Sequence, residues 1–165
     1  MQEQNFQQVL ENNKEKIYRI CRIYAISPIE PQDLFQEVVY QIWKSLKSFQ
    51  GKSNINTWVY RIALNVGMRS KLKLEKQNGK TIQFESIQFM AIEHPIDETQ
   101  IEKYKFLKEC ISSLNESDTS IVILYLEDLS YKQIAEVTGL TENHIAVKMK
   151  RIRQRLFDCI NPKLN

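Results

Sequence analysis

Polar and cationic side chains cluster at helical spacing near the C-terminal end of the chain. Three cations follow an imidazole at steps of four, three and four residues, which places all four groups on one face of a helix. A hydroxyl and an amide precede them, where that helix should begin. Side chains at the front of such a helix can reach base edges in a DNA major groove, and cations behind them can hold phosphates. The candidate DNA-binding set is Thr141, Asn143, His144, Lys148, Arg151 and Arg155.

A second set of polar side chains lies in the N-terminal half. Residues 49–56 have the composition of a loop, and this loop carries amide and ammonium groups. The helix expected after it carries polar side chains at four-residue steps, so they share one face. The set is Lys52, Asn54, Asn56, Arg61, Asn65, Arg69 and Lys73.

Enzyme chemistry is not indicated by any motif. The sequence has no Gly-rich phosphate loop, no paired metal ligands and no nucleophile–base signature. Its cysteines, Cys21, Cys110 and Cys159, are odd in number and far apart. We therefore expect free thiols in a reducing compartment rather than a zinc site or disulfides. Neither a metal nor a cofactor is expected.

Charge is distributed unevenly, although the net charge of the 165 residues is only +3. Residues 1–80 carry 13 Lys or Arg and 7 Asp or Glu, a balance of +6, and residues 131–165 carry 7 and 3, a balance of +4. Residues 81–130 carry 3 and 10, a balance of −7. Two basic segments on either side of an acidic one favour two separate contacts with a polyanion.

The first polar set requires a helix-turn-helix to position it. Helices are expected over residues 131–138 and from about 142 to 157, joined by a turn at Gly139. Ala135 supplies the small residue where two such helices cross, and Ile145 supplies the apolar residue that faces the first helix. The spacing of Ile145 with Met149, Ile152 and Leu156 predicts a buried stripe beside the cationic face, which is expected to be exposed.

The second polar set requires a group of N-terminal helices. One should begin near Pro31 and bury Phe35, Val38, Ile42 and Leu46. The next should run from about residue 58 to 76, with Asn56 or Thr57 as its cap and Val59, Ile62, Ala63 and Val66 as its buried stripe. Gly67, inside this helix, should loosen it by up to about 1 kcal/mol.

Periodicity is lost between residues 77 and 100, which we interpret as a flexible linker. The expected fold is therefore all-α, with two small helical domains at residues 1–76 and 101–165 and a helix-turn-helix in the second. No apolar run approaches the roughly 18 residues that span a bilayer, so no membrane insertion is expected. The cytoplasm is the expected location.

Both halves carry motifs of one known family. Residues 33–38 read Asp-Leu-Phe-Gln-Glu-Val, residues 49–51 read Phe-Gln-Gly, and residues 57–65 read Thr-Trp-Val-Tyr-Arg-Ile-Ala-Leu-Asn. Together with the helix-turn-helix that opens at residues 129–135, these stretches resemble the two domains of extracytoplasmic-function sigma factors, the small members of the sigma-70 family. The resemblance covers roughly residues 6–76 and 101–158.

The resemblance implies a partner for each set of side chains. Asp33, Leu34, Gln36 and Glu37 would bind the β′ clamp helices of core RNA polymerase, and the β flap would be a further contact. The second polar set would open and capture the −10 strand of promoter DNA, and the C-terminal set would read the −35 duplex. An anti-sigma factor would be a further partner, because members of this family are usually held inactive by one.

Other classes of protein explain less of the sequence. A free-standing helix-turn-helix regulator accounts for the C-terminal half, but it leaves the Asp-Leu-x-Gln-Glu and Thr-Trp-x-Tyr-Arg motifs unexplained and usually needs a dimerising surface. A helical anti-sigma or adaptor protein should complement the basic faces rather than carry them. We therefore expect a sigma factor that directs RNA polymerase to promoters.

Overall fold

The structure is a computed structural model that describes residues 2–25, 27–78 and 97–165. The chain divides into two compact units, Met1–Ser86 and Ile87–Asn165. Every regular element in the described residues is an α-helix, as the sequence predicts. Most of the expected linker, residues 79–96, lies outside the described residues.

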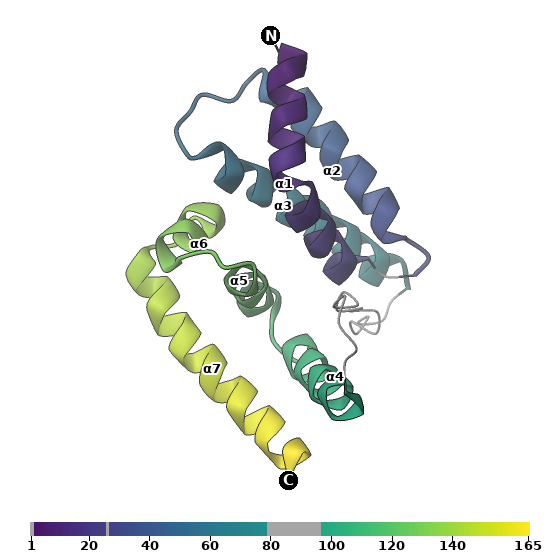
Figure 1. Ribbon diagram of the computed structural model, residues 1–165, viewed down its shortest axis with the longest axis vertical. Helices are drawn as coiled ribbons and strands as arrows, with labels where there is room; N and C mark the ends of the chain where they lie inside the picture. The colour runs from purple at the N-terminus through teal and green to yellow at the C-terminus, as the bar shows by residue number, and fades with distance from the viewer. Residues whose placement is uncertain (1, 26, 79–96) are drawn as a thin grey trace. The chain divides into compact units, whose positions relative to one another are not determined.

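The first unit consists of three helices, α1 (Gln2–Tyr24), α2 (Pro31–Leu46) and α3 (Ile55–Asn78). Each of them packs against the other two (Figure 1). Ile17, Ile20, Val38, Ile42 and Val59 are almost completely buried between them. The loop spans residues 47 to 54, two residues earlier at each end than predicted, and turns through Gly51, at φ 69°.

The buried stripe of α2 contains Val38 and Ile42 as predicted, but it begins one residue earlier, at Leu34, and Leu46 is only half-buried. Leu34, Val38 and Ile42 are buried, with a regular four-residue spacing. Phe35, predicted to be in the core, is only half-buried. A 3.6-residue period lets either of two adjacent positions begin such a stripe, and packing against α1 and α3 decides between them.

The start of α3 differs from the prediction. The helix begins at Ile55, and the amide N–H of Trp58 donates to the carbonyl oxygen of Asn54 at 3.1 Å. Oδ1 of Asn54 accepts from the amide N–H of Asn56 at 2.8 Å. Asn54 is therefore the cap, not Asn56 or Thr57, because the cap position belongs to the residue whose side chain reaches the first free N–H groups.

Gly67 has a packing role that the sequence does not reveal. A Cβ atom at this position would lie 2.6 Å from Cγ and Cδ2 of Tyr24 and 2.8 Å from its Cβ. Tyr24 is fully buried. Helices α1 and α3 thus approach each other at Gly67 more closely than any side chain there would allow.

The second unit contains α4 (Glu98–Ser112), α5 (Glu116–Leu126), α6 (Tyr131–Thr138) and α7 (Glu142–Leu164). Helix α7 packs against the other three (Figure 1). Helix α6 ends at Gly139, at φ 77°, and the side chains of Ala135, Ile145, Met149 and Ile152 are buried. These observations confirm the predicted helix-turn-helix, although Leu156 of the predicted stripe is only half-buried and α7 extends past residue 157, where we expected it to end.

The expectation that all three thiols are free is wrong. Cys110 of α4 and Cys159 of α7 form a disulfide. Residues that are 49 positions apart are brought together by the packing of α4 on α7, which cysteine spacing does not encode. Cys21 is a free thiol in the core of the first unit, where burial raises its pKa to about 12 and leaves almost no reactive thiolate at neutral pH.

Candidate nucleic-acid and polymerase interfaces

The front of α7 is formed by a capped helix N-terminus. Thr141 is the cap residue, and its Oγ1 accepts from the amide N–H of His144 at 3.1 Å. Asn143, His144 and Arg151 are exposed. His144 and Arg151 lie beside the buried stripe of α7 and not within it, so the predicted recognition face is accessible at these positions.

Two cations of the predicted face are held by an acid of a neighbouring helix. Nζ of Lys148 lies 3.2 Å from Oδ1 of Asp118, and Nη1 of Arg155 lies 3.5 Å from Oδ2 of the same carboxylate. The Lys148 side chain is 22% exposed, whereas that of Arg155 is 60% exposed. The prediction of a uniformly exposed cationic face is therefore wrong at Lys148, because a carboxylate from α5 holds its ammonium group against the unit.

Replacement of Asp118 by Asn should lower the free energy of unfolding of the second unit by about 1–2 kcal/mol. The figure is intermediate between that of an exposed ion pair and that of a fully buried one, because the Asp118 side chain is 10% exposed and its partners are more exposed. Both tryptophans belong to the first unit, so tryptophan fluorescence reports the unfolding of that unit alone. Circular dichroism reports both units, and the transition that it shows without a matching change in fluorescence is the unfolding of the second unit. Glu142→Gln, at an exposed position of α7, is the control. Equal stability of the two variants would show that the Asp118 pairs contribute nothing.

The outer face of α3 is accessible as predicted. Arg61, Asn65, Arg69 and Lys73 are all exposed and lie at four-residue steps over about four turns of helix. Lys52, in the loop before the helix, is exposed as well. This arrangement forms a basic track that can follow the backbone of a nucleic-acid strand.

The two asparagines at the start of α3 have less freedom than the sequence suggests. Asn54 is committed to capping through its Oδ1. Oδ1 of Asn56 accepts from Nδ2 of Asn13, a buried residue of α1, at 2.9 Å. Both side chains are still at the surface, but their oxygens are already engaged in hydrogen bonds within the unit.

The residues predicted to bind polymerase do not all reach the surface. Asp33, Gln36 and Glu37 are exposed on α2, and Oδ2 of Asp33 also accepts from the amide N–H of Glu30 at 3.2 Å. Leu34 is only 4% exposed and belongs to the core stripe, so its prediction as a contact residue is corrected. The residue at this position of the motif is apolar because it packs into the core of the first unit.

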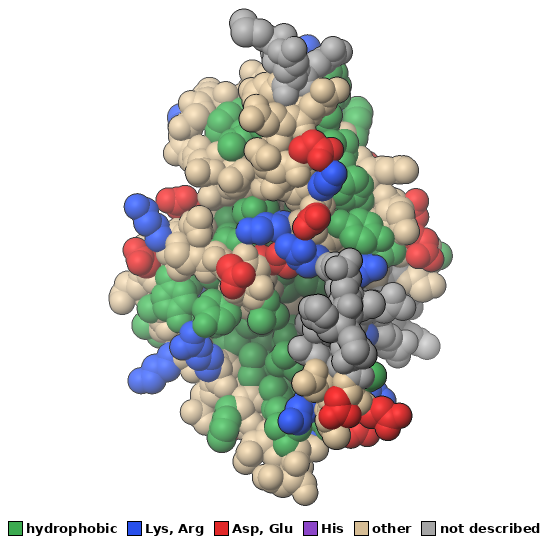
Figure 2. Space-filling model, in the orientation of Figure 1, with side chains coloured by type: hydrophobic (Ala, Val, Ile, Leu, Met, Phe, Trp, Pro, Cys, Tyr) green, Lys and Arg blue, Asp and Glu red, His purple; other side chains and the backbone are tan. Residues whose placement is uncertain are grey.

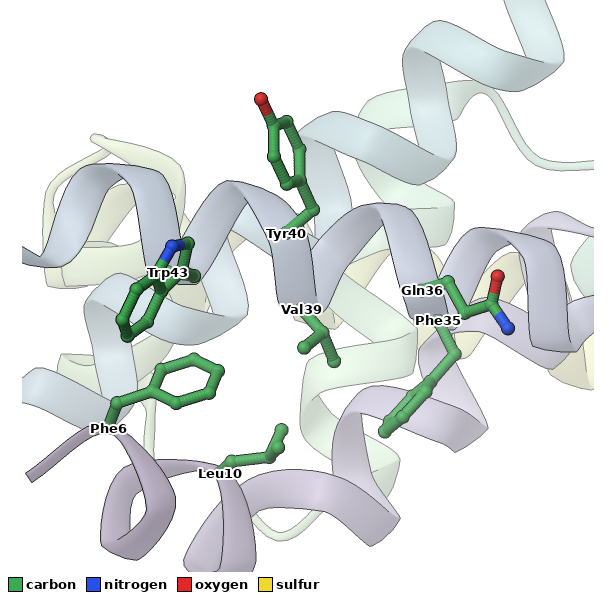
Figure 3. A pocket seen from close by; sticks show the side chains of 7 residues that line it. All are labelled: Phe6, Leu10, Phe35, Gln36, Val39, Tyr40 and Trp43. Carbon is green, nitrogen blue, oxygen red and sulfur yellow. The ribbon is translucent and has the colours of Figure 1, made fainter. Parts of the chain in front are cut away.

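An apolar groove, not identified from the sequence, runs beside these residues between α1 and α2 (Figure 3). Phe35 and Val39 point from α2 towards α1, where Phe6 and Leu10 meet them. The groove is lined by Phe6, Leu10, Phe35, Gln36, Val39, Tyr40 and Trp43.

Two aromatic side chains of the groove are also open to solvent. Trp43 is 43% exposed, although its ring packs edge-on against Phe6, and Tyr40 is 53% exposed. Hydrophobic side chains accordingly reach the surface along α2 in the space-filling view (Figure 2). Exposed aromatic groups beside an apolar groove are typical of surfaces that contact other proteins. Helical periodicity did not identify them, because both lie outside the buried stripe of α2.

Neither a metal site nor a membrane span is found in the part of the chain that the structure describes. No three His, Cys, Asp or Glu side chains there converge well enough to hold a metal ion. None of the described helices combines the length and apolar character needed to cross a bilayer.

Family models account for both units. Residues 9–75 match sigma-70 region 2, and residues 107–156 match sigma-70 region 4. The chain belongs to the sigma-70 family. It is a sigma factor of the extracytoplasmic-function group, which directs RNA polymerase in transcription initiation. The region 2 match contains α2 and the basic face of α3, and the region 4 match contains the helix-turn-helix.

The curated relatives are sigma factors, and the matches cover most of their length. RNA polymerase sigma factor SigV of Bacillus subtilis is 24% identical over 148 residues, which cover 86% of this chain and 82% of the relative. The extracytoplasmic-function RNA polymerase sigma-E factor of Haemophilus influenzae is 29% identical over 146 residues, covering 79% and 74%.

Solved structures share the fold. The sigma factor RpoE from Bartonella quintana, in complex with the anti-sigma factor NepR, aligns with a TM-score of 0.75 at 20% identity, over 95% of this chain and 97% of RpoE. CnrH, in complex with the cytosolic domain of CnrY, aligns with a TM-score of 0.69 at 16% identity, over 97% and 90%.

Proposed function

We propose that this sigma factor divides promoter recognition between its two units. Helix α7 of the second unit reads the −35 duplex with Asn143, His144 and Arg151, which are exposed on its outer face. The basic track of α3, with the loop before it, captures the −10 strand. The observation that carries this proposal is the presence of exposed polar faces on two separate units, within the segments that match regions 2 and 4.

Lys148 and Arg155 can contribute to DNA binding only in competition with their ion pairs to Asp118. Each must leave Asp118, wholly or in part, before it can hold a phosphate at full strength. The free energy of these pairs is then subtracted from the free energy of binding DNA. Among the residues that the structure describes, no carboxylate pairs with Arg151, so we assign it the larger share of the −35 contact.

The tethering of two modest contacts supports the same division. Binding of one unit to DNA raises the effective concentration of the other at its own element. Each contact is largely electrostatic and should weaken as salt rises.

Core polymerase docks, in this proposal, on α2. Asp33, Gln36 and Glu37 supply polar contacts with the β′ clamp helices, and the groove beside them supplies the apolar part. Gln36 lines the groove as well, so the polar and apolar parts are continuous. The second unit contacts the β flap.

Regulation and location follow from the same role. An anti-sigma factor is a proposed partner, supported by the structural neighbour RpoE, which was solved in complex with the anti-sigma factor NepR. The protein acts in the cytoplasm, where RNA polymerase transcribes DNA, and it is not itself an enzyme.

Trp43→Ala should weaken binding to core polymerase about tenfold. Truncation of an aromatic anchor at the centre of an interface removes more than about 1 kcal/mol of binding free energy. Leu72→Ala is the control, because Leu72 is 55% exposed on α3 of the same unit and does not line the groove. Fluorescence-detected titration of core enzyme with labelled sigma factor measures both. Unchanged affinity for Trp43→Ala would remove the groove from the proposed interface.

A further inference from the structure

Asn13 is a polar residue in an otherwise apolar part of the first unit. It is 1% exposed and lies on α1, between the core residues Val9 and Ile17. Its Oδ1 is buried and has no hydrogen-bond partner among the residues that the structure describes. An apolar side chain of similar size would avoid the desolvation of this oxygen, so core packing alone does not explain an amide here.

Nδ2 of Asn13 makes two hydrogen bonds that fix the direction of its amide. It donates to the backbone carbonyl oxygen of Val9 at 2.8 Å and to Oδ1 of Asn56 at 2.9 Å. A backbone carbonyl can only accept, so the atom of Asn13 that lies against it must be the nitrogen. The atom of Asn56 that receives the second bond must then be the oxygen.

The direction of the Asn56 amide is therefore set from within the protein. Its Oδ1 faces Asn13, so its NH2 group is the part of the amide left for a ligand, at the exposed start of α3. The neighbouring Asn54 also uses its Oδ1 internally, as the acceptor for the amide N–H of Asn56. The side-chain oxygens of Asn54 and Asn56 are thus engaged within the unit, and the side-chain groups left for a ligand at the start of α3 are chiefly donors.

We infer that Asn13 is a positioning residue for promoter recognition, which orients Asn56 so that the captured −10 base is read by a donor and must present an acceptor. This inference rests on the proposed role of Asn56 in capturing the strand. It goes beyond that role, because it assigns a function to a buried residue of α1 and sets the polarity of the contact. Asn13 itself does not touch DNA.

The test uses holoenzyme assembled from core polymerase and the full chain. Its binding to single-stranded non-template oligonucleotides, with each base in turn at every −10 position, is measured by fluorescence anisotropy. Asn56→Ala first identifies the position that Asn56 reads, as the one where base preference is lost. If this variant changes no position, the −10 role of Asn56 is itself overturned, and the inference with it.

Asn13→Leu should then lower base discrimination at that same position by about three- to tenfold, the range expected for one lost orienting hydrogen bond. Affinity for core polymerase and preferences at the other positions should be unchanged. The fold should be retained, because leucine also removes the unpaired buried oxygen. Asn12→Leu is the matched control, because Asn12 is exposed on the same helix.

Asn13→Asp tests the polarity directly. A protonated carboxyl group would donate its O–H to the carbonyl oxygen of Val9, and the same oxygen would accept from the NH2 group of Asn56. That contact would turn Oδ1 of Asn56 outward and shift the preference towards bases that present a donor. The inference is overturned if Asn13→Leu leaves discrimination at the Asn56 position unchanged. It is also overturned if Asn13→Leu weakens binding equally at all positions, because that result indicates a purely structural role.

Discussion

Replacement of Arg61, Arg69 and Lys73 by Gln should weaken binding of the −10 strand by holoenzyme about a hundredfold at about 0.1 M salt. Each phosphate contact to a single strand releases about 0.7 of a counterion, so three contacts contribute roughly two powers of ten under these conditions. The plot of log affinity against log salt should become shallower by about two for the same reason. Both quantities come from one series of oligonucleotide titrations at several salt concentrations.

A control triple variant separates contact from net charge. Lys14, Lys44 and Lys47 are exposed on or next to α1 and α2, and their replacement by Gln removes the same three charges from the first unit. This variant should lose little affinity and keep most of its salt dependence. Equal losses in the two variants would show that the strand responds to total charge, and the assignment of the α3 face would then be wrong.

Gly67→Ala should destabilise the first unit by about 2 kcal/mol and lower its midpoint of thermal unfolding by about 10 °C. Two opposing effects decide whether this substitution stabilises or destabilises the unit. Alanine improves helix propensity by about 1 kcal/mol. Its Cβ, however, would lie 2.6 Å from the ring of fully buried Tyr24, and overpacking of this kind costs about 3 kcal/mol. The ring cannot move away easily, because Cβ of Tyr24 is also within 2.8 Å.

Tryptophan fluorescence follows this transition, because both tryptophans of the chain are in the first unit. Ser70→Ala, on the same helix, reports the effect of propensity alone and should be neutral or slightly stabilising. Gly67→Val should be worse than Gly67→Ala, because more atoms enter the same space. A Gly67→Ala protein that is more stable than wild type would contradict the close packing of α1 on α3.

Local signals predict the helix-turn-helix well. Gly139 supplies the predicted left-handed residue between α6 and α7. Ser130, Gln133 and Thr141 were not predicted as caps, but they cap α6 and α7 through equally local contacts. The bounds predicted for α6 are those observed. The polar face of α3 is predicted for the same reason, because helical spacing alone determines which side chains share it.

Contacts between distant residues are what the sequence does not predict. Lys148 pairs with Asp118, 30 positions away, and Asn13 with Asn56, 43 positions away. The Cys110–Cys159 disulfide is of the same kind. Each depends on how two helices pack, and helical periodicity shows which side faces inward without showing what it meets. The corrected roles of Leu34 and Lys148 both have this cause.

Run-off transcription tests the central claim most directly. Purified chain is mixed with bacterial core RNA polymerase, the mixture is passed through gel filtration, and the complex is supplied with a library of promoter fragments. We predict co-elution with core enzyme and transcripts that depend on the chain and begin downstream of a shared pair of −35 and −10 sequences. Folded protein that neither co-elutes with core enzyme nor supports any transcript would contradict the account.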